Sequence, residues 1–190
     1  TLFNTNDLIT LLSNPSHRTN LINNLLYQVQ AGNADGVNVD FESFPASQKE
    51  NMVTFISDLT NAFHSEIPGS QVTIAMPAVD WNNAWDYNSL ANISDGLFIM
   101  GYAYHWSGSQ ATGPNSPLTG SGHTITSTVF DYLSKTNYQS EKLILGCPYY
   151  GFVWPSESNI PGSATTCTGQ AQFYSQMEGS ALSFGKLWHQ

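Results

Sequence analysis

Two kinds of hydrophobic pattern alternate along most of the chain. In three segments apolar residues recur at the spacing of a helix with one buried face; these are residues 15–31, 46–66 and 123–136. Four short apolar or alternating runs read as strands; these are residues 35–41, 71–76, 96–104 and 142–147. Strands that alternate with helices in this way predict an α/β fold with a parallel sheet.

The remaining segments lack a clear period. Residues 79–94, rich in Trp and Asn, and residues 107–122, rich in Gly, Ser and Pro, are expected to be loops, and the tail 155–190 is assigned no element. The second loop is long enough to be functional rather than a simple connector. A closed (β/α)₈ barrel needs eight strands and about 250 residues. Four strands therefore fit either an open sheet or part of a barrel.

The strand at residues 35–41 carries polar side chains on one face. The apolar face presents Val37, Val39 and Phe41, and the opposite face presents Asn38, Asp40 and Glu42. Strands of parallel sheets are normally apolar on both faces, and polar groups buried without partners cost several kcal/mol. Glu42 lies at the carboxyl end of the strand, where α/β proteins place their sites. The pattern therefore indicates a functional strand end.

Two carboxylates this close favour catalysis by an acid. Each negative charge raises the pKa of the neighbouring carboxyl group, so one proton is retained. A protonated Glu42 beside an ionised Asp40 is the division of labour that glycosidic cleavage uses. A solvated strand end or an ion-pair anchor remains an alternative, and a cation site is a weaker one because the oxygen-rich loop of calcium sites is lacking.

The composition of the chain excludes some classes of binding partner. Fourteen acidic residues against five basic ones give a net charge of -9, which repels nucleic acid and anionic lipid. No apolar run is long enough for a membrane helix, and no leader is apparent. A surface dominated by Ser, Thr and Asn is more common outside cells, so we expect an extracellular protein. Cys147 and Cys167 allow at most one disulfide and make no metal spacing.

Three motifs resemble those of family-18 glycoside hydrolases, the chitinase family. The stretch from Asp35 to Glu42 (DGVNVDFE) resembles their DGxDxDxE signature, and residues 100–103 (MGYA) are similar to their Met-x-Tyr-Asp motif. Residues 146–151 (GCPYYG), followed by Trp154, look like their Gly-x-Pro-x-Tyr-Gly strand end. The resemblance covers residues from about 2 to 154, and more loosely to about 175.

The resemblance implies a partial TIM (β/α)₈ barrel. In the family these motifs lie on the fourth, sixth and seventh strands, with residues 71–76 as the fifth. Residues 1–154 would then be part of a catalytic barrel, about strands four to seven, that does not close on its own. Residues 155–190 would be the connection to strand eight or the start of an inserted α+β subdomain. We expect the isolated chain to be inactive, because its strand edges would be exposed.

The resemblance also implies a retaining, substrate-assisted hydrolysis of β-linked N-acetylglucosamine polymers such as chitin. Glu42 would be the acid, Asp40 would orient the acetamido group, Tyr102 would hydrogen-bond it, and Asn38 would support Asp40. No metal or cofactor is needed, and the full-length protein is expected to be monomeric. Five further residues are expected to contact substrate: Met100, Tyr104, Trp106, Tyr149 and Trp154.

Two departures from the family pattern leave alternatives open. Asn38 replaces the first Asp of the DxD pair, and Ala103 replaces the Asp that follows the motif's Tyr. Loss of that Asp removes a substrate contact and part of the negative field around the acid. A chitinase-like carbohydrate-binding protein with impaired catalysis is therefore the second hypothesis, and peptidoglycan or N-glycan cores are alternative substrates.

Other residues are expected to be structural. Three acidic residues are interpreted as loop caps: Asp80, Asp86 and Asp95. Met52 and Met76 are expected in the core, and His105 is expected to position a neighbour rather than to act as a base.

Overall fold

The structure, a computed structural model, describes residues 4–184. The chain divides into two compact units. The first consists of Thr1–Ile99 and Asp131–Ile144, and the second of Met100–Phe130 and Leu145–Gln190.

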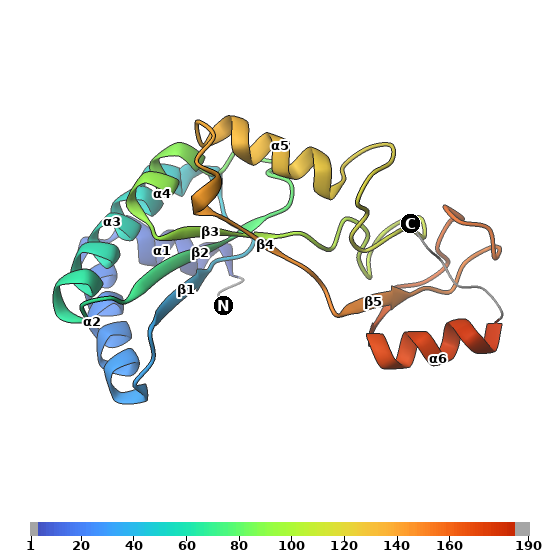
Figure 1. The fold of residues 1–190 in the computed structure, drawn as a ribbon, viewed down its shortest axis with the longest axis horizontal. Coiled ribbons are helices and arrows are strands. Elements are labelled where there is room, and N and C mark those ends of the chain that lie inside the picture. The colour runs from blue at the N-terminus through green and yellow to red at the C-terminus, as the bar shows by residue number, and fades with distance from the viewer. Residues whose placement is uncertain (1–3, 185–190) are drawn as a thin grey trace. The chain divides into compact units, whose positions relative to one another are not determined.

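Four strands form one sheet in the order β1-β2-β3-β4 (Figure 1). They are β1 (Gly36–Asp40), β2 (Gln71–Pro77), β3 (Gly96–Met100) and β4 (Leu143–Gly146). Strands β1 and β2 are parallel, with Gly36 opposite Gln71 and Asp40 opposite Ala75. The predicted α/β fold with a parallel sheet is confirmed. Within residues 4–184 the sheet is open, with β1 and β4 at its edges.

Four helices pack around these strands in the first unit. They are α1 (Thr5–Ser13), α2 (Pro15–Gly32), α3 (Lys49–Glu66), which a 3-10 turn (Ala46–Gln48) precedes, and α4 (Tyr87–Ile93). Helix α3 contacts β2, α2 contacts β1, and α4 lies beside α3. Asn14 ends α1 and caps α2 by accepting a hydrogen bond from the Ser16 N–H at 2.9 Å. The predicted start of this helix at Pro15 is confirmed, and its end is set by Asn33 in a left-handed conformation (φ 48°).

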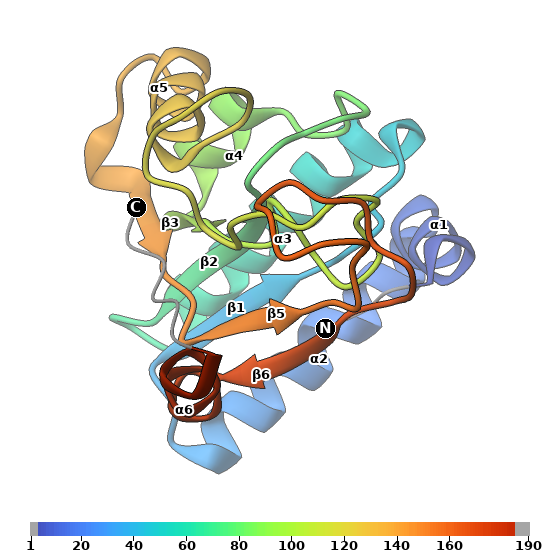
Figure 2. The same ribbon diagram turned by 90° about the vertical axis from the view of Figure 1, so that its right-hand side faces the viewer.

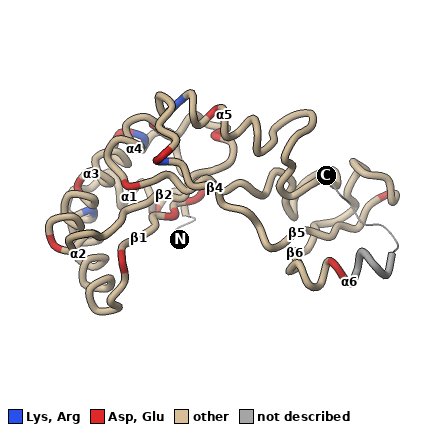
Figure 3. The backbone as a smooth tube through the Cα atoms, in the orientation of Figure 1, with Lys and Arg blue, Asp and Glu red and all other residues tan. Residues whose placement is uncertain are grey.

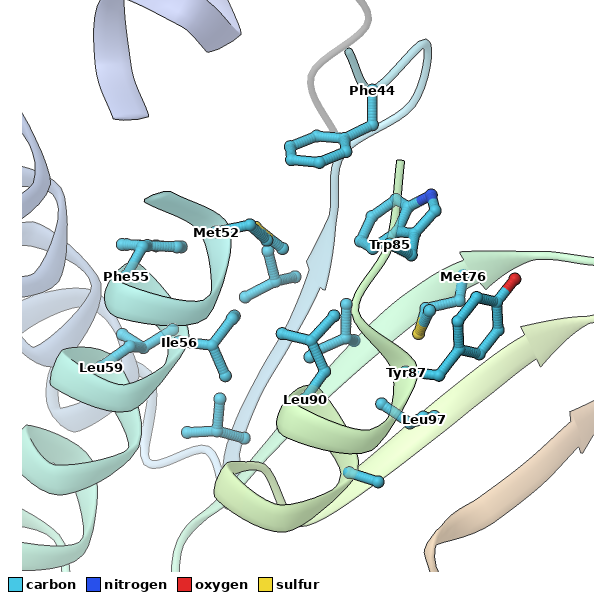
Figure 4. Packing of buried hydrophobic residues seen from close by; sticks show 14 of the residues in the cluster. Phe44, Met52, Phe55, Ile56, Leu59, Met76, Trp85, Tyr87, Leu90 and Leu97 are labelled. Atoms are coloured by element: carbon cyan, nitrogen blue, oxygen red, sulfur yellow. The ribbon is translucent and has the colours of Figure 1, made fainter. Parts of the chain in front are cut away.

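The core of the first unit lies between the helices and the sheet (Figure 4). Helix α3 contributes Met52, Phe55, Ile56 and Leu59, all at most 1% exposed. They pack with Leu90 of α4 and with strand residues such as Met76 and Leu97. The predicted core positions of Met52 and Met76 are confirmed.

The second unit contains an antiparallel hairpin. Strands β5 (Tyr150–Val153) and β6 (Gln170–Phe173) pair with Tyr150 opposite Phe173, and α6 (Tyr174–Phe184) follows β6 directly (Figure 2). Residues 107–116 are hydrogen-bonded to the segment after β5, for example Thr112 N–H to the Ser163 carbonyl at 2.9 Å. Among the described residues of this unit, Glu157 and Glu178 are the only Asp, Glu, Lys or Arg (Figure 3).

Two sequence predictions differ from the structure. The strand predicted at 96–104 ends at Met100, and the loop predicted at 79–94 contains α4. The sequence analysis also assigned no element to α1 or to β6 and α6 of the tail, of which residues 185–190 lie outside the described part. These elements are short, and the hairpin depends on pairing across some 20 residues of chain, which leaves little local pattern.

Helix α5 (Ile125–Lys135) and strand β4, which a 3-10 turn (Ser140–Lys142) precedes, match the predicted segments 123–136 and 142–147 within a few residues. Residues 107–122 contain no helix or strand, as expected for a loop. Ile144 and Leu145 on edge strand β4 are exposed.

Candidate active site

At the start of strand β1 its backbone lies very close to the backbone at the start of β2. The Gln71 N–H donates to the Asp35 carbonyl at 2.9 Å. Gly36 has φ +152°, and a Cβ atom there would lie 1.9 Å from the Gln71 carbonyl oxygen. Only glycine tolerates this position. Asp35 therefore anchors the start of the strand. It is an odd number of residues from Asp40, so the alternation along a strand does not place the two side chains on the same face.

The two faces of β1 differ as the alternation predicts. Val39 is 4% exposed and belongs to the core, whereas Asn38 is exposed and Asp40 is half-buried. The Asn38 side-chain amide donates to the Thr73 hydroxyl of β2 at 2.8 Å. The Oδ1 atom of Asp40 is shielded from solvent. Asn38 is thus fixed by the neighbouring strand at one side of Asp40.

Glu42 lies two residues beyond the end of β1 and is half-buried. Two neighbouring aromatic rings anchor the backbone around it. Phe41 stacks on Phe55 of α3 at 5.9 Å between ring centroids, and Phe44 packs on Trp85 at 4.6 Å. Burial, and then the negative charge of Asp40, raise the pKa of the Glu42 carboxyl above its ordinary value. Both effects favour the protonated form that an acid catalyst needs.

The segment after β3 carries Tyr102. The Gly101 N–H donates to the Gly146 carbonyl at 3.2 Å. A Cβ atom at residue 101 would lie 2.7 Å from that carbonyl oxygen, so the backbones meet too closely for a larger residue. The ring of Tyr102 meets the ring of Tyr150 edge-on, with centroids 5.9 Å apart. Ala103 is exposed and has a left-handed conformation, φ 60°.

The aromatic residues expected to contact substrate differ in exposure. The Tyr104 hydroxyl is hydrogen-bonded to that of Thr128 at 2.7 Å, and burial raises the pKa of Tyr104. Trp106 is 55% exposed, and its carbonyl accepts from the half-buried Trp154 indole at 3.0 Å. Tyr149 is 84% exposed. Trp106 and Tyr149 therefore offer the most ring surface to a ligand.

The candidate residues are divided between the two units. Asn38, Asp40 and Glu42 belong to the first. The second holds the remaining six: Met100, Tyr102, Tyr104, Trp106, Tyr149 and Trp154.

Two of the three loop caps that the sequence suggests are present. Asp80 accepts from the backbone N–H groups of Ala84 and Trp85 at 2.9 and 3.1 Å, and Asp86 accepts from Ser89 at the start of α4. Asp95 accepts from the Val72 N–H at 2.6 Å. The predicted cap roles of Asp80 and Asp86 are confirmed, whereas Asp95 binds strand β2 instead of capping a loop.

Three further side chains are a histidine and two tryptophans. A ring nitrogen of His105, Nδ1, lies 3.1 Å from the Pro114 carbonyl oxygen, consistent with the structural role expected of it. Trp85, 5% exposed, is a core residue, whereas Trp81 is 76% exposed.

Within residues 4–184, no three His, Cys, Asp or Glu side chains gather as metal ligands. Cys147 and Cys167 are both exposed free thiols. Within the same residues, no helix is long and apolar enough to span a membrane.

One residue of the second unit escaped the sequence analysis. Asn115 lies in the 107–122 loop, and its side chain bonds to the backbone of Ala103 and of Tyr150. Its partners are 12 and 35 residues away along the chain. No periodic pattern links residues at such separations, so no local signal could have revealed it.

Comparisons with known proteins agree with the fold and the motifs. A protein of Bacillus subtilis named as a sporulation-specific glycosylase, YdhD, is 32% identical over 157 residues, covering 80% of this chain and 35% of that protein. Its crystal structure aligns with a TM-score of 0.77 at 28% identity, over 96% of this chain and 58% of that one. Di-N-acetylchitobiase of Rattus norvegicus is 31% identical over 154 residues, covering 73% of this chain and 39% of the relative.

A solved complex extends the comparison. The Ostrinia furnacalis Group IV chitinase in complex with allosamidin aligns with a TM-score of 0.78 at 25% identity, over 91% of this chain and 54% of that one. The chain thus spans 35 to 39% of the length of the two curated relatives. The sequence model of Glycosyl hydrolases family 18 matches residues 4–184. The chain belongs to glycosyl hydrolase family 18.

Proposed function

We propose that the protein containing this chain hydrolyses β-linked N-acetylglucosamine polymers with retention of configuration. The observation that carries the proposal is Glu42 itself. It is a half-buried carboxyl at the end of β1 whose pKa is raised by burial and then by the charge of Asp40. A raised pKa keeps a carboxyl protonated to a higher pH, and a protonated carboxyl can protonate a leaving oxygen.

In the proposed reaction Glu42 donates its proton to the glycosidic oxygen. The acetamido carbonyl oxygen of the same sugar attacks the anomeric carbon as the glycosidic bond breaks, which forms a cyclic oxazolinium intermediate. The Glu42 carboxylate then takes a proton from water as that water attacks the anomeric carbon. The bond from this carbon to the acetamido oxygen breaks, which restores the acetamido group and gives net retention. A nucleophile held on the substrate makes the step intramolecular, which is worth up to roughly 7–11 kcal/mol in well-oriented systems.

Three other groups have supporting roles in the proposal. Asp40 orients the acetamido N–H and stabilises the positive charge of the intermediate. Asn38, held by its hydrogen bond to Thr73, supports Asp40. The Tyr102 hydroxyl hydrogen-bonds the acetamido oxygen. The expected substrate-contacting residues are Met100, Tyr104, Trp106, Tyr149 and Trp154.

The proposed architecture is part of a (β/α)₈ barrel, with β1 to β4 as about strands four to seven. Residues 1–154 would belong to the catalytic barrel, and residues 155–190 to the connection before strand eight or an inserted subdomain. The parallel pairing of β1 and β2 and the match to the family support this assignment. We also propose that the full-length protein is extracellular and monomeric.

The names of two relatives support the proposed substrate class. One is named a di-N-acetylchitobiase, and a chitinase that resembles this chain was solved with allosamidin. Chitin or its oligosaccharides are therefore the proposed substrates. Peptidoglycan and N-glycan cores are the alternative substrates; the Bacillus subtilis relative is named as a sporulation-specific glycosylase, not as a chitinase.

The test replaces Glu42 in the complete protein. Glu42→Gln is expected to abolish turnover of chito-oligosaccharides because the amide cannot donate an acidic proton. Glu50→Gln, the same chemical change at an exposed residue in the first turn of α3, is the matched control and should retain activity. Undiminished turnover by Glu42→Gln would refute the assignment of the acid.

A second test concerns the nucleophile. An oligosaccharide from which the acetyl groups have been removed lacks the attacking carbonyl oxygen. It is expected to bind but not to be cleaved. Equal rates for the acetylated and deacetylated substrates would rule out substrate assistance.

Ala103 favours a second candidate function. Its side chain cannot contact a sugar as the family's Asp would, and the residue is exposed on the segment that carries Tyr102. A carbohydrate-binding protein without turnover would bind chito-oligosaccharides in calorimetry and release no shorter products over prolonged incubation.

A further inference from the structure

Asn115 makes three hydrogen bonds to segments that carry candidate site residues. Its side-chain oxygen accepts from the Ala103 N–H at 2.8 Å, and its backbone carbonyl accepts from the Tyr104 N–H at 3.1 Å. Its side-chain amide donates to the Tyr150 carbonyl at 2.8 Å. One residue of the 107–122 loop therefore joins the chain just after Tyr102 to the start of β5.

The bonds of Asn115 fall where Tyr102 needs support. On the other side of Tyr102, the Gly101 N–H donates to the Gly146 carbonyl, and the Gly101 carbonyl accepts from the Ser116 hydroxyl at 2.6 Å. The Tyr102 ring itself rests edge-on against the Tyr150 ring at 5.9 Å. The backbone on both sides of Tyr102, and the residue its ring contacts, are thus held by hydrogen bonds.

The conformation of Ala103 shows why such support is needed. Its φ of 60° lies in the left-handed region, which is unfavourable for a residue with a Cβ atom. Residues in this conformation persist where the surrounding structure holds them. The side-chain oxygen of Asn115 binds the N–H of this residue.

We propose that Asn115 is a positioning residue for Tyr102. By holding Ala103 and Tyr150 together, it fixes the direction in which the Tyr102 ring and hydroxyl point. The catalytic part of this inference rests on the proposed function of Tyr102. These two hydrogen bonds need an acceptor and a donor on one short side chain, which Asn provides and Asp, Ala and Leu do not.

The experiment combines kinetics with a structure. In the complete protein, Asn115→Ala removes both side-chain bonds and is expected to lower kcat for chito-oligosaccharides by about 10- to 100-fold while KM changes little, as a misplaced catalytic group does. Asn115→Asp keeps the acceptor for Ala103 but sets a carboxylate against the Tyr150 carbonyl. Its kcat should therefore lie between those of the wild type and Asn115→Ala. If Asn115→Ala does not fold, Asn115→Asp provides the kinetic test in its place.

Two comparisons separate positioning from a general loss of structure. Thr112→Val removes the hydrogen bond from the Gly162 N–H to the Thr112 hydroxyl, in the same loop, and should leave kcat unchanged. In a Tyr102→Phe background, Asn115→Ala should cause no further fall in kcat, because the hydroxyl it positions is absent. A full further fall would overturn the inference.

A crystal structure of the Asn115→Ala protein gives a readout that does not depend on activity. The Tyr102 ring is expected to leave the Tyr150 ring, and residues 101–104 to change conformation. An unchanged ring position would overturn the inference. If the wild-type protein cleaves no substrate, the proposed function fails, but the ring position still decides whether Asn115 holds Tyr102.

Discussion

Asp95 is expected to contribute more to stability than its ion pair alone suggests. Its Oδ2 atom accepts from the backbone N–H of Val72 at 2.6 Å and lies 3.0 Å from Nε2 of His64 at the end of α3. The Asp95 N–H donates to the Val72 carbonyl at 2.8 Å. Asp95 thus fixes β2 opposite Val37, one residue before Asn38.

The magnitude follows from which partner is buried. Val72 is fully buried, so Asp95→Ala leaves its N–H without its acceptor, which costs about 1–3 kcal/mol. The His64 side chain is 46% exposed, so its pairing with Asp95 is worth only about 0–1 kcal/mol. A loss of about 2 kcal/mol corresponds to a fall in Tm of roughly 4–8 °C for a domain of 150–250 residues.

Scanning calorimetry of three variants of the complete protein checks this reasoning. Asp95→Ala should lower Tm by the amount above, and His64→Ala should lower it much less. Asp95→Asn retains an oxygen that can accept from Val72 and should melt close to wild type. Equal falls in Tm for Asp95→Ala and His64→Ala would refute the argument, since the buried N–H would then carry no weight.

Three other substitutions give distinct expectations. Burial, and then the charge of Asp40, raise the pKa of Glu42, and a raised carboxyl pKa stabilises the fold only in the protonated state. Glu42→Gln should therefore raise Tm at neutral pH and not below about pH 4; a difference in Tm that is independent of pH would contradict this. Gly36→Ala drives a Cβ atom into the Gln71 carbonyl and should cost at least about 1–3 kcal/mol from strain alone, seen as a lower Tm; a wild-type Tm would count against it. Trp106→Ala removes an exposed ring and should raise KM for chito-oligosaccharides about 2- to 10-fold at unchanged Tm; an unchanged KM would show that the ring does not contact substrate.

The features that sequence reasoning predicted have local causes. The alternation along β1 separates buried Val39 from exposed Asn38 because a strand points successive side chains to opposite faces. Asp80 and Asp86 could be read as caps because short acidic side chains bond to N–H groups a few residues ahead. Periods of two or 3.6 residues likewise predicted α2, α3 and β2 within a few residues.

The features that it missed depend on distant parts of the chain. Helix α4 spans seven residues in a Trp- and Asn-rich segment, too short for a period to emerge. Strand β6 exposes Gln170 and is defined by its pairing with β5 rather than by its own pattern. The role of Asn115 arises from contacts with residues 103, 104 and 150, which only the folded chain brings together.

The scarcity of formal charge in the second unit has a practical consequence. Its described residues include two carboxylates, Glu157 and Glu178, and neither Lys nor Arg. Dissolved ions weaken attraction between exposed charges over about 10 Å at 0.1 M but leave ring stacking and neutral hydrogen bonds largely intact. Under the proposed function, the binding of neutral sugars to Trp106 should therefore change little with salt concentration.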